Sequence, residues 1–97
     1  MIRHMVLFRF KPSADDEQRR ELLALLGDLP RQFPAMQGFQ LGANVSKRDG
    51  RYSHGMTMSF NSLGELEDYL NSDRHEAFVR DKFAPIIEER SIVSMVD

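Results

Sequence analysis

The amino-acid sequence predicts an α+β fold with the element order β-α-β-β-α-α-β. Four segments show the two-residue alternation or the short apolar runs of strands, and the segments between them carry the apolar stripes of helices. Capping and turn residues separate these segments. The order is the ferredoxin-like split arrangement, which predicts a four-stranded antiparallel sheet with helices on one face. We expect residues 1–97 to form one domain, because so short a chain leaves no room for a second.

The first strand is expected over Ile2–Phe10, where both faces are apolar at the centre and are therefore expected to be covered. A helix follows, since Ser13 and Asp16 resemble a capping box. Pro30 is expected to stop this helix. Its apolar stripe consists of Leu22, Leu23, Leu25, Leu26 and Leu29.

Two strands are expected in the middle of the chain, over Gly38–Ser46 and Arg51–Phe60. Asp49-Gly50 between them is a sequence typical of a tight hairpin turn. In the later strand, bulky side chains alternate with small ones, so its two faces differ. The bulky face carries Tyr52, His54, Met56, Met58 and Phe60.

The last helical region is expected in two pieces. Ser62 and Glu65 form a capping box for the first piece, and Asn71-Ser72 interrupts it. Asp73 then opens the second piece, which Pro85 kinks or ends. A short final strand is expected over Ile92–Val96.

Composition excludes several classes of protein. The formal net charge is -2 and the basic residues are scattered, which argues against a nucleic-acid-binding surface. There is no apolar run of membrane-spanning length, and the amino terminus is too short and too charged for a signal peptide. The chain has no cysteine, which removes disulfides, thiolate nucleophiles and cysteine-ligated zinc. We therefore expect a cytoplasmic protein with no nucleic-acid or membrane partner.

One face of the sheet is expected to remain without helices. Met5 and Leu7 lie on that face beside the small residues Gly55, Thr57 and Ser59. An apolar face without a cover tends to mark an interface, and two such faces can pack back to back around a two-fold axis. We expect a homodimer through this open sheet face rather than a monomer with one wet face, because a single small core is marginal.

The three histidines are the main candidates for chemistry. In the expected register, His4 and His54 both point between the sheet and the helices, although either could be a structural ring bonded to a carbonyl or a water. The helix break allows Tyr69 and His75 to converge, with the histidine as a general base and the tyrosine as a hydrogen-bond donor. The alternative for this pair is a packed tyrosine and a solvated histidine.

Other catalytic arrangements find little support in the sequence. The histidines are not spaced as a metal-binding pair and no ligand carboxylate is evident, so neither a metal nor another cofactor is expected. Serine-nucleophile and phosphate-loop motifs are not found.

Several short segments, together with Tyr69, resemble those of the stress-responsive dimeric α/β-barrel domain family, often called Dabb, over essentially the whole chain. They are Ile2-Arg3-His4, Phe10-Lys11, Phe39, Gly42, Asn44-Val45-Ser46 and His75-Glu76-Ala77-Phe78-Val79. The resemblance implies a dimeric α/β barrel. It also implies polyketide-cyclase-like chemistry, in which a histidine matching His75 takes the proton next to a carbonyl and a tyrosine matching Tyr69 binds the substrate.

The family comparison also shows differences. Pocket histidines of the cyclases match His4 and His54, but the cyclases have a further histidine and a proline where this chain has residues 71–74. Their aromatic helix wall is replaced here by leucines, which implies a smaller or differently shaped ligand.

We therefore expect each subunit to bind a small, mostly apolar carbonyl or phenolic compound. Cofactor-independent proton transfer, as in aldol cyclisation or isomerisation, is the expected activity. The alternatives are a non-catalytic stress-responsive ligand-binding module and, by analogy with other barrels of this kind, a cofactor-free monooxygenase. The expected substrate-binding residues are His4, Val6, Phe8, Leu22, Leu26, His54, Met56 and Phe78, beside the catalytic pair Tyr69 and His75.

Overall fold

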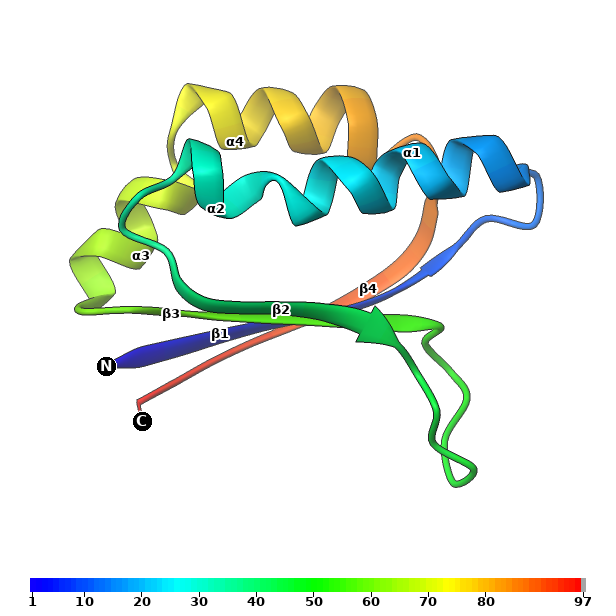
Figure 1. Cartoon of the computed structure of the whole chain (residues 1–97), viewed down its shortest axis with the longest axis horizontal. Helices are drawn as coiled ribbons and strands as arrows, with labels where there is room; N and C mark the ends of the chain where they lie inside the picture. The colour runs from blue at the N-terminus through cyan, green and yellow to red at the C-terminus, as the bar shows by residue number, and fades with distance from the viewer. Residues whose placement is uncertain (97) are drawn as a thin grey trace.

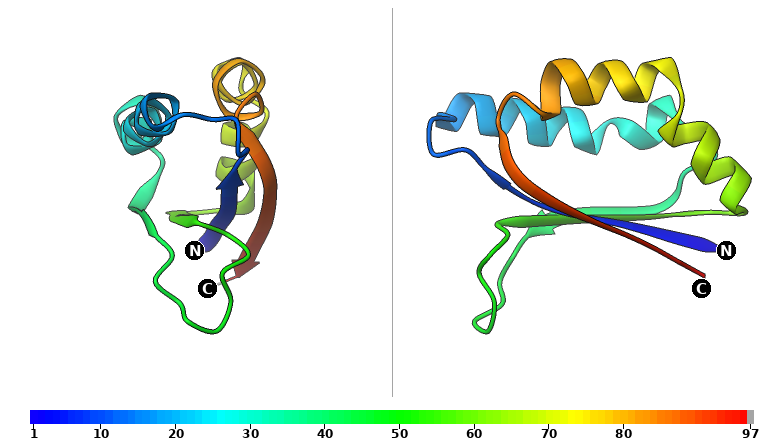
Figure 2. Two further views of the ribbon diagram at one scale, coloured as in Figure 1. Left: turned by 90° about the vertical axis from the view of Figure 1, so that its right-hand side faces the viewer. Right: turned by 180° about the vertical axis from the view of Figure 1, so that it is seen from behind.

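The computed structural model describes residues 1–96 and confirms the α+β, ferredoxin-like fold. Its strands form one antiparallel sheet in the order β2-β3-β1-β4. The helices lie together on one face of this sheet (Figure 1), and the side and rear views show the same two layers (Figure 2). The elements are β1 (Ile2–Phe10), α1 (Asp16–Gly27), α2 (Leu29–Gln32), β2 (Gln37–Ala43), β3 (His54–Phe60), α3 (Leu63–Leu70), α4 (Asp73–Phe78), the π-helical turn η1 (Val79–Phe83) and β4 (Ile87–Val96).

The cap of the first helix lies two residues later in the chain than expected. Asp15, not Ser13, caps α1: its carboxylate accepts from the backbone N–H of Gln18 at 2.8 Å, and the Gln18 side chain accepts from the Asp15 N–H at 2.9 Å. This reciprocal pair satisfies two N–H groups that would otherwise have no partner at the helix end. Pro30 does not stop α1, which ends at Gly27; it lies in the first turn of α2, where its missing N–H costs nothing.

The segment between β2 and β3 is a long loop rather than the tight hairpin expected at Asp49-Gly50. The strands end at Ala43 and start again at His54, and the loop over residues 44–53 projects to the side opposite the helices (Figure 1). The Asn44 side chain closes this loop by donating to the carbonyl oxygens of Asp49 and Tyr52 at 2.9 and 2.7 Å.

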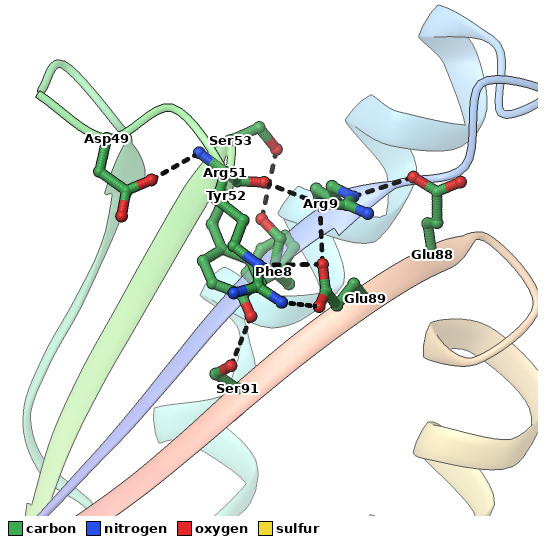
Figure 3. Close-up of polar contacts among 9 residues, drawn as sticks. All are labelled: Phe8, Arg9, Asp49, Arg51, Tyr52, Ser53, Glu88, Glu89 and Ser91. Atoms are coloured by element: carbon green, nitrogen blue, oxygen red, sulfur yellow. Dashed lines mark hydrogen bonds and ion pairs between the residues drawn. The ribbon is translucent and has the colours of Figure 1, made fainter. Parts of the chain in front are cut away.

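The final strand is longer than expected because it includes a charged stretch. β4 starts at Ile87, and a register irregularity opposite Arg9 and Phe10 accommodates the extra residue Glu88. Arg9 then reaches both Glu88 and Glu89, at 2.9 and 2.7 Å, and Arg51 of the loop reaches Glu89 at 2.6 Å (Figure 3). As an edge strand, β4 can carry these charges because one of its sides faces solvent.

The interruption of the second helical region lies where it was expected. Ser62 caps α3, accepting from the Glu65 N–H at 3.2 Å, and Asn71 follows its last turn. Ser72, rather than Asp73, caps α4: its hydroxyl accepts from the His75 N–H at 3.1 Å and donates to the Tyr69 carbonyl at 2.8 Å. One serine therefore ends one helix and starts the next.

The sheet register decides which side chains face the helices. Residues paired across neighbouring strands point to the same face. His4 lies between Met58 and Ser94, Val6 between Met56 and Ile92, and Phe8 between His54 and Arg90. These rows pack toward the helices and include Phe8 and Met58, which are completely buried. The opposite face has no helix over it among residues 1–96 and exposes Leu7, Val93 and Met95.

Candidate functional site

A cavity of about 110 Å³ lies between the helix-facing side of the sheet and the helices, close to the break between α3 and α4. Its walls are mostly apolar, with a few polar side chains that could orient a ligand, which is the usual character of a small-molecule site. It is lined by His4, Val6, Leu26, Leu29, Met56, Tyr69, Leu70, His75, Phe78, Val79, Phe83, Arg90 and Ile92.

The cavity brings together most of the side chains that the sequence suggested. The expected base and donor, His75 and Tyr69, both line it, and His4 lies with them. The expected apolar lining is present in part, through Val6, Leu26, Met56 and Phe78.

His54 does not share this cavity, which corrects the expectation that three histidines meet. His54 pairs with Phe8, four residues along β1 from His4, so the backbone positions of the two histidines are about 13 Å apart along the strand direction. Its ring stacks on Phe8 with centroids 5.5 Å apart, and its Nδ1 bonds to the Ser53 hydroxyl at 2.9 Å. Burial lowers the pKa of His54, and the nearby Arg19 guanidinium lowers it further. The ring therefore packs at the other end of the sheet.

Phe8 and Leu22 are likewise outside the cavity lining. Phe8 is completely buried and packs edge-to-face against Phe10 and Phe83, so it belongs to the core. Leu22 is buried on α1 and lines a different hollow, beside Pro85. Both face the helix–sheet layer as expected, but neither reaches the space that a ligand would occupy.

Tyr69 and His75 are in direct contact. Their ring centroids lie 4.6 Å apart at an angle of 60°. In one straight helix, a spacing of six residues would put the two side chains on different sides of the helix axis. The interruption at Ser72 allows them to point the same way. Two residues from two short helices therefore face one cavity.

The His75 ring is held in one orientation and one tautomer. Its Nδ1 lies 3.0 Å from the carbonyl oxygen of Leu70, which can only accept, so Nδ1 carries the proton and Nε2 keeps its lone pair. Burial lowers the pKa of His75, the Leu70 carbonyl and the Glu76 carboxylate oppose this, and the Arg90 guanidinium adds to the lowering. The net direction is downward, so the imidazole is neutral at neutral pH and Nε2 can accept a proton.

Tyr69 remains protonated over the same pH range. Burial raises the pKa of its phenol to about 12. Its ring also packs against Phe33 and Phe60, with centroids 4.8 and 5.5 Å away, which fixes the ring plane. A protonated, fixed phenol suits a hydrogen-bond donor to an oxygen that gains negative charge.

His4 lies buried on β1, with 2% of its surface exposed. Its Nδ1 lies 2.8 Å from the Ser94 hydroxyl of the neighbouring strand. Burial lowers the pKa of His4, and the repulsion from His75 lowers it further, so the two imidazoles are electrostatically coupled. His4 is thus a neutral polar group in the cavity wall.

The lowered pKa of His4 makes stability depend on pH. Above about pH 7.5, a full unit over the ordinary histidine pKa of about 6.5, the ring is neutral in both states and contributes no pH dependence. Below that value the unfolded chain binds the proton more readily, so the free energy of unfolding falls until the pH passes the folded-state pKa. We expect His4→Gln to lose less stability than the wild type between about pH 7.5 and 5.5, measured by urea unfolding. Equal losses in the two proteins would contradict the assignment.

Sequence reasoning missed part of the lining, including Leu29, Arg90 and Ile92. The signal for the last two was present, because Arg90, Ile92 and Ser94 alternate along a strand that was expected to start only at Ile92. Extending that alternation upstream would have placed Arg90 on the same face as Ile92.

Residues 1–96 contain neither a metal-binding cluster nor a membrane-spanning helix. No group of three or more histidine, aspartate or glutamate side chains there is arranged to hold a metal ion. No helix in the same residues combines the length and the apolar character needed to cross a membrane.

Residues 2–97 match the model of one protein family, the stress responsive A/B barrel domain, Dabb. In sequence, the chain is similar to olivetolic acid cyclase of Cannabis sativa. The two are 24% identical over 79 residues, which are 79% of this chain and 78% of the cyclase.

Solved structures show the same fold at low sequence identity. A Dabb family protein from Mesorhizobium loti superposes with a TM-score of 0.88 at 24% identity, covering 99% of this chain and 95% of that one. The hydroxynitrile lyase of Passiflora edulis superposes with a TM-score of 0.88 at 21% identity, covering 99% of this chain and 92% of the lyase. A dimeric ferredoxin-like protein from Thermobifida fusca superposes with a TM-score of 0.83 at 23% identity, covering 99% of this chain and 90% of that protein.

Proposed function

Because the chain belongs to the stress responsive A/B barrel domain (Dabb) family, we propose that its cavity binds a small, mostly apolar carbonyl or phenolic compound. His75 and Tyr69 catalyse a cofactor-independent proton transfer on this compound, of the kind used in aldol cyclisation or isomerisation. Two proteins similar to this chain are named as a cyclase and a lyase, which agrees with an enzymatic use of the site.

One observation carries the proposal: the hydrogen bond from His75 Nδ1 to the Leu70 carbonyl. It leaves Nε2 as the basic atom of a neutral imidazole in the wall of an apolar cavity, with the Tyr69 phenol beside it. A general base needs a free lone pair and a pKa near the working pH, and a structural histidine needs neither.

The proposed reaction begins at the carbon next to the substrate carbonyl. Nε2 of His75 takes a proton from this carbon, the electron pair of the broken C–H bond forms the enolate, and the negative charge moves to oxygen. The Tyr69 hydroxyl donates a hydrogen bond to that oxygen. The Leu70 carbonyl and the Glu76 carboxylate both favour protonated His75, so they stabilise the imidazolium until it returns the proton.

Exchange of carbon-bound hydrogen tests this reaction without knowledge of the natural substrate. In D₂O, the protein should speed deuterium incorporation next to the carbonyl of phenylacetone, followed by proton NMR. Binding of phenylacetone without faster exchange would contradict catalysis and favour the non-catalytic module. Oxygen consumption during turnover of a phenolic compound would favour the monooxygenase instead. No binding of apolar carbonyl compounds at all would overturn the proposed function.

We further propose that two copies of the chain pack through the open sheet face. Leu7 and Val93 are 42% and 50% exposed there, on neighbouring strands, and Met95 adds to the same face. The loop over residues 44–53 projects on this side and carries Val45, which is 88% exposed. Similar proteins from Thermobifida fusca and Jannaschia are described as dimeric. Apolar area of this kind is stabilised when a second copy covers it.

Substitution of Leu7 by arginine tests the interface. Leu7→Arg places a charge at the centre of the apolar face, so we expect light scattering to report about 11.2 kDa instead of twice that mass. Leu63→Arg is the matched control, because Leu63 is 54% exposed on α3, on the helix side of the sheet, and should leave the dimer intact. A Leu7→Arg protein with unchanged mass would exclude this face as the interface.

A further inference from the structure

Arg90 carries the permanent positive charge in the wall of the cavity. On β4, its Cα lies opposite Phe8, so its side chain leaves the sheet on the helix side. Ile92, two residues on, lines the same cavity opposite Val6. Arg90 is exposed, so its charged group can stay hydrated while the residue borders the apolar cavity.

The acidic residues beside Arg90 in the sequence are already paired with other cations. Glu88 and Glu89 bind Arg9, at 2.9 and 2.7 Å, and Glu89 also binds Arg51 at 2.6 Å (Figure 3). Within residues 1–96, the Arg90 guanidinium makes no hydrogen bond and no ion pair, and the residue is exposed at the cavity rim. Its five N–H donors are therefore available to a ligand.

Arg90 also acts on the basic group of the site. Its guanidinium lowers the pKa of His75 through space, and both side chains line the same cavity. Glu76 on α4 is the acidic group that acts on His75 in the opposite direction, but it is exposed and is not part of the cavity lining. An anion entering the cavity would therefore meet a cation at its rim and mainly apolar walls inside.

We propose that the cavity selects ligands with a carboxylate, which the Arg90 guanidinium binds at the rim while the apolar body of the ligand lies against Val6 and Ile92. The guanidinium fork matches a carboxylate with two parallel hydrogen bonds, which a lysine ammonium cannot reproduce. This inference rests on the proposed function and narrows it: the compound whose carbon-bound proton His75 removes carries a carboxylate in addition to the carbonyl or phenol group at which His75 and Tyr69 act.

Hexanoate and hexanamide separate the charge preference from simple occupation of the cavity. The two compounds have the same chain and differ in the charge of the head group. At low ionic strength we expect the wild type to bind hexanoate about 10-fold more tightly than hexanamide, by calorimetry or ligand-observed NMR. Arg90→Gln should bind both equally, and Arg90→Lys should keep part of the preference.

A second arginine provides the control for net charge. Arg80 lies on η1, pairs with Asp81 at 2.9 Å and does not line the cavity, so Arg80→Gln should keep the full preference for hexanoate. Equal binding of the two compounds by the wild type would overturn this inference while the hexanamide result still supports the cavity as a ligand site. A preference that survives in Arg90→Gln would overturn it too. Binding of neither compound would overturn the proposed function together with the inference.

Discussion

Replacing His75 by glutamine is expected to slow deuterium exchange into phenylacetone by about 100-fold or more, the usual contribution of a general base. Glutamine is close in size and can still donate a hydrogen bond toward the Leu70 carbonyl, which His75 Nδ1 now bonds at 3.0 Å. It has no basic nitrogen in place of Nε2, so it cannot accept the proton. Exchange rates from proton NMR, with binding of phenylacetone measured separately, check the prediction.

His54→Gln is the matched control for this experiment. It removes another imidazole with a lowered pKa, but one that packs on Phe8 outside the cavity lining. We expect His54→Gln to exchange deuterium at the wild-type rate. That result, together with slower exchange in His75→Gln, would assign the base to His75. If His75→Gln exchanged as fast as the wild type while still binding phenylacetone, His75 would not be the base.

Phe8→Ala is expected to lower the free energy of unfolding by about 3–5 kcal/mol. Phe8 is fully buried and contacts Phe10, Phe83 and His54 through its ring, so its removal leaves a void that neighbouring rings cannot fill without moving. Such a loss is a large share of the roughly 5–15 kcal/mol that stabilises a domain of this size. Urea unfolding followed by circular dichroism measures it.

Leu63→Ala serves as the reference for Phe8→Ala, since Leu63 is an exposed apolar residue on α3. Its removal should change stability by no more than about 0.5 kcal/mol. A loss for Phe8→Ala as small as this would show that the site collapses around the missing ring. It would also reopen the earlier interpretation of Phe8 as a residue of the ligand pocket.

The sequence allowed the order of the elements and the inward face of each long strand to be predicted. Alternation along β1 placed His4, Val6 and Phe8 on one side, and the register confirms that they share it. Alternation says nothing, however, about position along the strand. His54 has the expected face, but its backbone position lies about 13 Å from that of His4 along the strand direction, because His54 pairs with Phe8 instead of a residue near His4.

The contact between Tyr69 and His75 could be predicted because it depends on a local sequence signal, the helix interruption at Asn71-Ser72. Arg90 could not be placed in the same way. Residues 88–90 are all charged, so the sequence did not indicate that β4 starts before them. The strand tolerates these charges because it lies at the sheet edge and because Arg9 and Arg51 form ion pairs with its glutamates. Such pairs join residues far apart in the chain, so no local pattern predicts them.

The interruption between α3 and α4 also supplies the acceptor that orients the imidazole. In one continuous helix, the Leu70 carbonyl would accept from the backbone N–H of Arg74, four residues on, and would not be free for a side chain. Here the chain turns at Ser72, and the freed oxygen receives Nδ1 of His75 instead. Insertions, deletions or strong helix formers that fused the two segments would remove this acceptor. The His75 ring would then no longer be held in one orientation and one tautomer, although His75 itself would still be present in the sequence.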